Sequence, residues 1–340
     1  MAQIKIADIA HVRFAAPDLA AMQAFLEDFG LKCSSGADGR LYARGADGRP
    51  FLHVTERGDA GFVALGLRAA SIDDLHRLAA AEGVAVNDLA MPGGGSVVSL
   101  IDPDGFVIEV VAGQHNDPPS TTPTDAVRNS AAARPRFRAT VRVHKGPAHV
   151  VRLGHCVLNV SDFRRSERWY KDRFGFLTSD EIEAAPGLAL GAFMRCDRGD
   201  KPADHHTLFL AQLPQPKGFL HAAFEVANFD DLMAGHAHLK AKQRTAAWGV
   251  GRHILGSQIF DYWKDPWGHE LEHWTDGDLF TADDPPGKAT AADLLAVQWG
   301  MGHPMLAGRL APSPGVASFF MALSIRIKRL FGKSETGKIA

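Results

Sequence analysis

The 340-residue chain is poor in cysteine, in long hydrophobic segments and in net charge. Its three cysteines, Cys33, Cys156 and Cys196, are too few for a disulfide framework and suggest a reducing compartment. No apolar run approaches the roughly 20 residues that span a bilayer, and residues 1–8 lack the features of a signal peptide. A net charge of −2 excludes a global basic field for nucleic acid or anionic membranes. We therefore expect a cytoplasmic protein without a nucleic-acid partner.

Histidine, in contrast, is plentiful. The chain has 16 histidines against its three cysteines, so a metal site would be built from nitrogen and oxygen ligands. The composition, 46% hydrophobic and 22% charged, is that of a globular protein. At about 150 residues per domain, the length predicts two domains.

Four segments share the pattern of a β-rich strand, a polar cap and an amphipathic helix. The strands are expected at residues 9–14, 62–67, 153–160 and 220–226, and the helices at 18–29, 71–82, 161–174 and 228–242. Ser, Asn and Asp at the helix starts would satisfy free N–H groups. The Asp-Pro-x-Gly turns at 102–105 and 265–268 each lead into a final strand. The unit is therefore βαβββ, and four such units predict an α+β fold of two domains.

The composition changes between and after these units. Residues 113–147 are rich in Pro, Ser, Thr, Ala and Arg, which is typical of a linker. We therefore expect an N-terminal domain at 1–112, a C-terminal catalytic domain at 148–276 and a tail at 277–340. Within the tail, residues 316–331 are apolar with interleaved basic residues, which indicates an amphipathic helix. We expect it to contact the domain or a neighbouring subunit of a homo-oligomer, with membrane-surface contact as the less favoured alternative.

Two histidines and a carboxylate on the predicted strands of the second domain could form a metal site. His155 lies early in the third unit's first strand and His221 in the equivalent strand of the fourth unit, whose last strand carries Glu270 and Glu272. Two imidazoles and one carboxylate can hold Fe(II) on one face and leave three positions open. A single histidine in such a position is more often an ordinary surface or core residue than a metal ligand. No local spacing motif links the three positions.

The repeat chooses between the two glutamates. Glu109 follows Asp102 by the same interval that separates Glu272 from Asp265, whereas Val107 stands where the fourth unit has Glu270. The repeated architecture therefore favours Glu272.

The first domain is interpreted as a degraded copy of the second. His11 matches His155 and Glu109 matches Glu272, but Phe62 is taken to stand where the second domain has His221. We therefore expect metal in the second domain only.

The second domain resembles the two-domain extradiol catechol dioxygenases of the vicinal oxygen chelate superfamily. The matching stretches are Leu153-Gly-His155, Asp204-His-His206-Thr, Leu220-His221-Ala-Ala-Phe-Glu-Val, Gly251-Arg-His253 and Ile259-Phe-Asp-Tyr262 through Gly268-His-Glu-Leu-Glu272. Each alone is weakly specific, but their order over about 120 residues is informative. The first domain matches in architecture.

The resemblance implies a set of roles for these residues. It implies that His155, His221 and Glu272 bind Fe(II), or Mn(II), which suits the same ligands. His206 would be the acid–base histidine, and His253 and Tyr262 would bind and deprotonate the substrate hydroxyls. Because successive strand residues face opposite ways, only one of the adjacent His205 and His206 should point inward, and the family pattern favours His206. The substrates would be a catechol-type aromatic diol and O2.

Three other functions remain open at this point. A 4-hydroxyphenylpyruvate-dioxygenase-like oxygenase or a glyoxalase-like isomerase could share the fold, but neither is expected to carry His206, His253 and Tyr262 together. A non-catalytic protein that binds an aromatic ligand would have no evident need for a complete ligand set.

Overall fold

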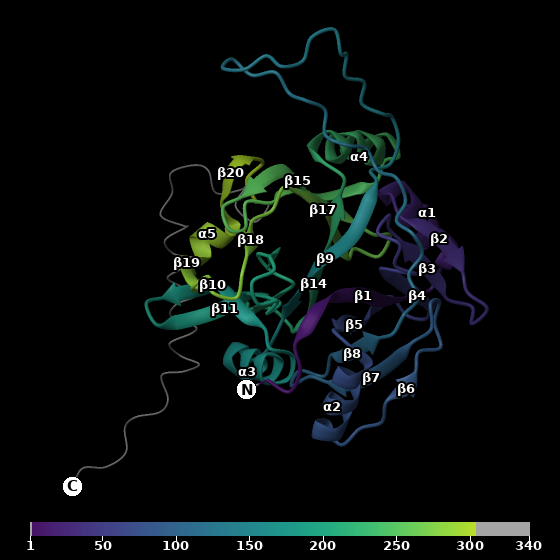
Figure 1. The fold of residues 1–340 in the computed structure, drawn as a ribbon, viewed down its shortest axis with the longest axis vertical. Coiled ribbons are helices and arrows are strands. Elements are labelled where there is room, and N and C mark those ends of the chain that lie inside the picture. Colours follow the sequence, from purple (N-terminus) through teal and green to yellow (C-terminus); the bar gives the residue numbers. More distant parts are fainter. Residues whose placement is uncertain (1, 304–340) are drawn as a thin grey trace.

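The structure, a computed structural model, describes residues 2–303 (Figure 1). The first unit comprises β1 (Ile6–Ala16), α1 (Leu19–Phe29), β2 (Lys32–Ser35), β3 (Leu41–Arg44) and β4 (His53–Arg57). The second comprises β5 (Gly61–Ala69), α2 (Ile72–Glu82), β6 (Asn87–Asp88), β7 (Ser96–Ile101) and β8 (Val107–Ala112). Both units follow the predicted βαβββ order.

The second half repeats this order. The third unit comprises β9 (Val150–Asn159), α3 (Phe163–Phe174), β10 (Leu177–Ala185), β11 (Leu188–Arg195), the short β12 (Ala203–Asp204) and β13 (Leu208–Ala211). The fourth comprises β14 (Gly218–Val226), α4 (Phe229–Ala241), β15 (Thr245–His253), β16 (Ile259–Lys264) and β17 (Glu270–Thr275). After it come β18 (Leu279–Phe280), β19 (Gly287–Thr290), α5 (Ala291–Leu295) and β20 (Val297–Gly300). The predicted α+β fold of four βαβββ units is confirmed.

The four long helices begin and end where local chemistry predicts. Asp18 caps α1 by accepting hydrogen bonds from two backbone N–H groups of the first turn, and Ser71 and Asn228 cap α2 and α4. Side-chain oxygens at this position satisfy donors that have no partner inside the helix. Gly30, at φ 105°, ends α1 in the left-handed conformation that glycine adopts without a steric penalty.

Each half of the chain builds one sheet. The eight-stranded sheet of the first half has the order β2-β3-β4-β1-β5-β8-β7-β6. The ten-stranded sheet of the second half has the order β19-β10-β11-β13-β9-β14-β17-β16-β15-β20. In both sheets an antiparallel central pair, β1–β5 or β9–β14, is flanked on each side by a parallel neighbour. The centre of each sheet therefore brings together the first and last strands of two units.

The segments outside the four units have different structures. Residues 113–147, all of which the structure describes, contain no helix or strand and form a long loop that extends past α4 (Figure 1). Residues 279–300 add β19 to one edge of the second sheet and β20 to the other. The predicted amphipathic helix at 316–331 lies outside the described residues. No helix among residues 2–303 has both the length and the apolar character that a membrane crossing needs.

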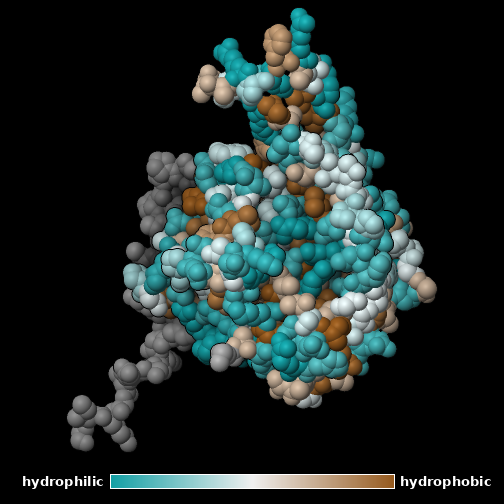
Figure 2. Space-filling model, viewed as in Figure 1, coloured by the Kyte–Doolittle hydropathy of each residue, from teal (hydrophilic) through white to brown (hydrophobic). Residues whose placement is uncertain are grey.

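One hydrophobic core joins the two halves. A single cluster of buried residues includes Phe25 of α1 and Leu65 of β5 together with Leu153 of β9 and Phe224 of β14. The face of the molecule in Figure 2 is mostly hydrophilic, with hydrophobic residues scattered over it. The burial of apolar surface between the halves therefore holds the two sheets together.

Candidate metal centre

Strand register brings the candidate ligands of the second half together. His155 on β9 lies opposite Ala223 on β14, and Ala223 lies opposite Glu272 on β17. Because Ala223 has only a methyl side chain, the longer side chains on either side can meet above it. His221 precedes Ala223 by two residues and therefore points to the same face of the sheet. Tyr262 on β16 continues this row, because it lies opposite Glu272.

The three ligand atoms form a nearly equilateral triangle. Nε2 of His155 lies 3.3 Å from Nε2 of His221 and 3.3 Å from Oε2 of Glu272. Nε2 of His221 lies 3.4 Å from the same carboxylate oxygen. His155 and Glu272 are buried, while the side chain of His221 retains 18% exposure. The triangle therefore sits inside the sheet with an opening on the His221 side.

This triangle fits a divalent metal ion. Ligand atoms about 2.0–2.2 Å from one ion, at angles near 90–110°, lie about 3.0–3.5 Å from each other. Neither carboxylate oxygen of Glu272 has a hydrogen-bond partner of normal geometry, and Nδ1 of His155 has none. Buried polar atoms without partners are costly, and a cation between the three side chains would compensate Glu272. Glu270, the other candidate carboxylate, is instead 39% exposed and lies 3.8 Å from Lys264.

Electrostatics favour the metal-binding protonation states of Glu272 and His155. Burial alone would raise the pKa of Glu272, but the close imidazoles of His155, His221 and His253 outweigh it and hold that pKa well below its usual value. Burial lowers the pKa of His155. An ionised carboxylate beside a neutral imidazole is the state in which both groups can donate electron pairs to a metal.

His253 and Tyr262 lie beside the triangle. The Tyr262 hydroxyl is 3.1 Å from Nε2 of His253, which is itself 3.7 Å from Oε1 of Glu272. Burial, together with the charge of Glu272, raises the pKa of Tyr262 well above its usual value, so the phenol stays protonated. The His253 ring stacks on Phe260 with centroids 4.1 Å apart. These two side chains can therefore offer hydrogen bonds to a ligand at the metal centre.

His206 lies on the other side of the triangle. Its ring centroid is 3.9 Å from that of His155, and burial lowers its pKa well below the usual value, so the ring is neutral. Of the two adjacent histidines, His206 is the one whose ring packs against His155, whereas His205 faces Asp180. Both are buried, and their Nδ1 atoms are 3.0 Å apart. Residues 205–207, between β12 and β13, are not part of a strand, so strand alternation does not apply to them.

Apolar side chains surround this group of polar residues. Phe193 on β11 contacts the His206 ring with centroids 4.7 Å apart and stacks on Phe209 of β13. A hydrophobic cluster around these rings also includes Val157, Ile182, Leu220 and Leu255. On the opposite side, Trp248 packs against Tyr262 and His253. The metal centre therefore has apolar walls on both sides.

The first half has the same row but a different centre. His11 on β1 lies opposite Gly66, which lies opposite Glu109, as His155, Ala223 and Glu272 do in the second half. His11 and Arg13 contact the Glu109 carboxylate at 2.8 and 3.1 Å. The guanidinium thus supplies the positive charge beside the carboxylate.

The predicted equivalence of Phe62 and His221 is wrong. Register with β8 pairs Ala64 with Val107, as register with β17 pairs His221 with Glu270. Ala64, rather than Phe62, therefore stands in the place of His221. The first half still lacks the second imidazole.

Two other features could be mistaken for sites. His144, His149 and Asp231 have ligand atoms near one another, but Nε2 of His144 also lies 3.0 Å from the Pro147 carbonyl oxygen and Nδ1 of His149 lies 2.7 Å from Asp231. Hydrogen bonds therefore account for this cluster.

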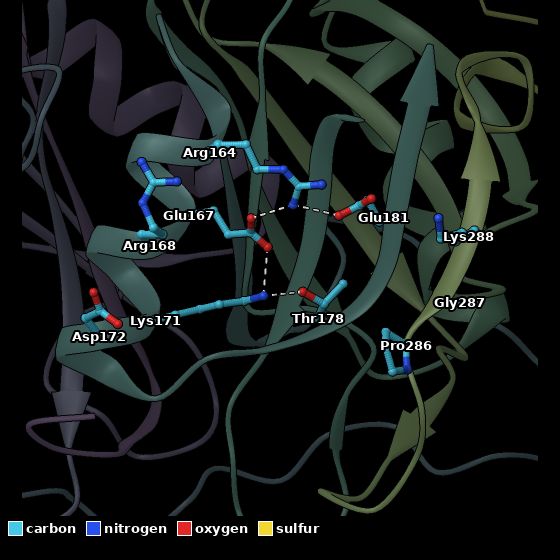
Figure 3. Close-up of a pocket in the computed structure, with 10 residues that line it drawn as sticks. All are labelled: Arg164, Glu167, Arg168, Lys171, Asp172, Thr178, Glu181, Pro286, Gly287 and Lys288. Carbon is cyan, nitrogen blue, oxygen red and sulfur yellow. Dashed lines mark hydrogen bonds and ion pairs between the residues drawn. The ribbon is translucent and has the colours of Figure 1, made fainter. Parts of the chain in front are cut away.

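A surface hollow of about 450 Å³ lies between α3, β10 and residues 286–288 (Figure 3). In it, Arg164 and Lys171 are both paired with Glu167, and Arg164 also contacts Glu181. These ion pairs connect α3 to β10. None of the metal-centre residues lines this hollow.

The chain is similar to known proteins over most of its length. Residues 152–273 match the model of the Glyoxalase/Bleomycin resistance protein/Dioxygenase superfamily. The chain is 30% identical to metapyrocatechase 2 of Cupriavidus necator over 302 residues. This aligned stretch covers 86% of this chain and 88% of that protein. It is 25% identical over 304 residues to the iron-dependent extradiol dioxygenase of Rhodococcus jostii (strain RHA1), with 81% and 90% coverage.

Among solved structures, the Mn(II)-bound glyoxalase from Novosphingobium aromaticivorans is similar over 88% of this chain and 93% of its own, with a TM-score of 0.72 and 23% identity. This likeness shows that the two proteins share the fold.

Proposed function

This chain belongs to the extradiol catechol dioxygenases of the glyoxalase/bleomycin resistance protein/dioxygenase superfamily, and from that premise we propose that it cleaves the ring of a catechol-type diol with O2. The reaction would take place at Fe(II) held by His155, His221 and Glu272. The observation that carries this proposal is the triangle of ligand atoms, 3.3–3.4 Å apart, around a buried carboxylate without hydrogen-bond partners.

The metal and the surrounding side chains would have different roles in the reaction. Fe(II) bound on one face by two imidazoles and a carboxylate supplies open coordination positions and Lewis acidity toward the two catechol hydroxyl oxygens. The surrounding side chains would orient the ring and manage its protons. Mn(II) suits the same ligand set.

His253 and Tyr262 would orient the diol. Because the Tyr262 phenol stays protonated, it can donate a hydrogen bond to a substrate oxygen that has lost its proton. His253, within 3.1 Å of that hydroxyl, can accept a proton from the substrate and hold it at Nε2. Fixing the diol in one orientation removes much of the entropic cost of bringing the reactants together.

His206 would transfer the second proton. It is neutral, it packs against His155, and only its Nδ1 is bonded to a neighbouring side chain. Its Nε2 can therefore take a proton from one reacting oxygen and return it to another.

The apolar walls favour an uncharged substituent on the ring. Phe193, Phe209 and Leu255 belong to the hydrophobic cluster beside His206 and offer no partner for a carboxylate. Burying an unpaired charge there would be costly, whereas an alkyl or aryl group would gain from burial. We therefore propose that the enzyme prefers alkyl- or aryl-catechols to catechols that carry a carboxylate.

An anaerobic loading experiment tests the proposed function. Protein loaded with Fe(II) under nitrogen is mixed with 3-methylcatechol and then exposed to air. A yellow ring-fission product is expected from the wild type and from His76→Ala, which changes an exposed histidine of α2, but not from His221→Ala. Binding of the catechol without colour would contradict the proposal and support a ligand-binding role.

A further inference from the structure

We propose that Asp180 and His205 form a buried hydrogen-bond relay behind His206 that fixes the tautomer of its imidazole, leaving the Nε2 lone pair free for the reactants. The role of His206 as proton carrier rests on the proposed function, whereas the relay itself is a property of the folded chain. Asp180 and His205 are positioning residues, because they act through His206.

Three side chains from separate segments form the relay. Oδ2 of Asp180 on β10 lies 2.7 Å from Nε2 of His205, and Nδ1 of His205 lies 3.0 Å from Nδ1 of His206. The two histidines are 1% and 3% exposed, and the side chain of Asp180 is 19% exposed. The relay therefore runs from a partly exposed carboxylate on β10 to the histidine that packs against His155.

The direction of the hydrogen bonds follows from the chemistry of the first group. An ionised carboxylate can only accept, so whenever His205 carries a single proton, that proton is on Nε2. The Nδ1 atom of His205 then carries a lone pair and can only accept from Nδ1–H of His206. A neutral imidazole has a single N–H, so Nε2 of His206 is left as an acceptor. Asp180 thereby sets the state of a ring that it does not touch.

Two glycines show that the surroundings are built around this relay. A Cβ atom on Gly256 would lie 2.8 Å from Nδ1 of His205, and one on Gly287 would lie 2.1 Å from Oδ1 of Asp180. Gly287 on β19 pairs directly with Asp180 on β10, so the strand added after the fourth unit closes over the carboxylate. Phe193 and Phe280 flank the His205 ring. With close packing on each side, His205 has little freedom to turn away from its partners.

Nitrogen-15 NMR of the histidine side chains tests the relay independently of catalysis. Metal-free protein is used, because Fe(II) would broaden the signals, and the pH is set above the usual histidine pKa. We expect His205 as the Nε2–H tautomer and His206 as the Nδ1–H tautomer. Asp180→Leu, which removes the acceptor, should convert His206 to the Nε2–H form or to a mixture. Finding wild-type His206 as the Nε2–H tautomer would overturn the proposal.

A pair of substitutions at His205 separates the relay from simple packing. In His205→Gln, the glutamine amide can donate to Asp180 and accept from His206, so His206 should remain the Nδ1–H tautomer. In His205→Leu, the leucine can do neither, so His206 should lose this tautomer. This pair also decides the question if Asp180→Leu does not fold. Equal tautomers in the two variants would contradict the relay. As a control, Glu181→Gln changes the neighbouring residue of β10, which is paired with Arg164, and should leave the His206 tautomer unchanged.

Turnover gives the second measurement. In the Fe(II)-loaded enzyme, Asp180→Leu and His205→Leu should lower kcat about 10- to 100-fold, with KM and metal content unchanged, and His205→Gln should recover most of kcat. A loss of metal content instead would indicate a merely structural role and overturn the relay. Absence of ring cleavage in every protein, with the expected tautomers present, would refute the proposed function and leave the relay supported.

Discussion

At the scale of residues, the two halves of the chain differ in what balances the charge of a buried glutamate. Both place a histidine and a glutamate in one row across three strands, which leaves a carboxylate in an apolar sheet. In the first half Arg13 contacts Glu109 and neutralises it. In the second half Val157 stands where the first has Arg13, and the ion-pair partners of Glu272 are imidazoles. A metal cation is the natural counter-charge there.

This difference predicts where metal binds. We expect His221→Ala to lose the bound metal after desalting, because two remaining ligands cannot hold it against competition from water. His11→Gln, the change at the matching row of the first half, should keep the wild-type stoichiometry. Elemental analysis of both variants checks this, and metal loss from His11→Gln would show that the first half also binds an ion.

A second prediction separates binding from proton transfer. His206→Ala should keep its metal but slow turnover by about 10²–10⁴-fold, which is the range of positioned general acid–base groups. His76→Ala serves as the control. Metal content and kcat are measured on the same preparations, and normal turnover of His206→Ala would remove His206 from the proton-transfer role.

At the scale of elements, local patterns in the sequence predicted strands, helices and caps, but not the pairings between them. The caps Asp18, Ser71 and Asn228 act through hydrogen bonds within their own helices, so a few residues suffice to identify them. Strand register, in contrast, depends on partners tens of residues away, so the sequence alone does not show that Ala64, rather than Phe62, is the equivalent of His221. No sequence pattern singles out Asp180, because it meets His205 only after folding.

One contact between elements gives a pH-dependent prediction. Asp28 at the end of α1 accepts hydrogen bonds from Arg244 at 2.6 and 2.9 Å and lies 3.1 Å from His238 of α4. Burial alone would raise the pKa of Asp28, but these partners outweigh it and lower the pKa below 3.8. A depressed carboxyl pKa stabilises the fold above the unfolded value and stops doing so as the pH falls through the folded value.

We therefore expect Asp28→Asn to lower the free energy of unfolding by about 1 kcal/mol near neutral pH, a modest figure for a partly exposed ion pair. The difference from the wild type should shrink below about pH 4. Urea unfolding at several pH values measures it. A difference that persists unchanged in acid would show that charge at Asp28 contributes nothing.

At the scale of the whole molecule, the two sheets share one core and should unfold together. Phe14 of β1 is fully buried and contacts His53 and Phe62 of the first half as well as Phe219 and His269 of the second. A side chain in this position stabilises both halves.

Phe14→Ala should consequently lower the free energy of unfolding by about 3–5 kcal/mol, the usual cost of removing a buried phenylalanine ring. Differential scanning calorimetry should show a single transition at a lower temperature. Phe137→Ala, the same change at a residue of the linker that is 82% exposed, should have almost no effect. Two transitions, of which only one moves, would contradict the shared core.

Phe62 and Phe219 hold equivalent positions in the two halves, and their rings stack on each other with centroids 5.0 Å apart. When two identical subunits associate around a two-fold axis, residues near that axis meet their own counterparts. In the same way, the stacked pair lies where the two similar halves of this chain meet, and a change to either ring alters a contact that both halves share.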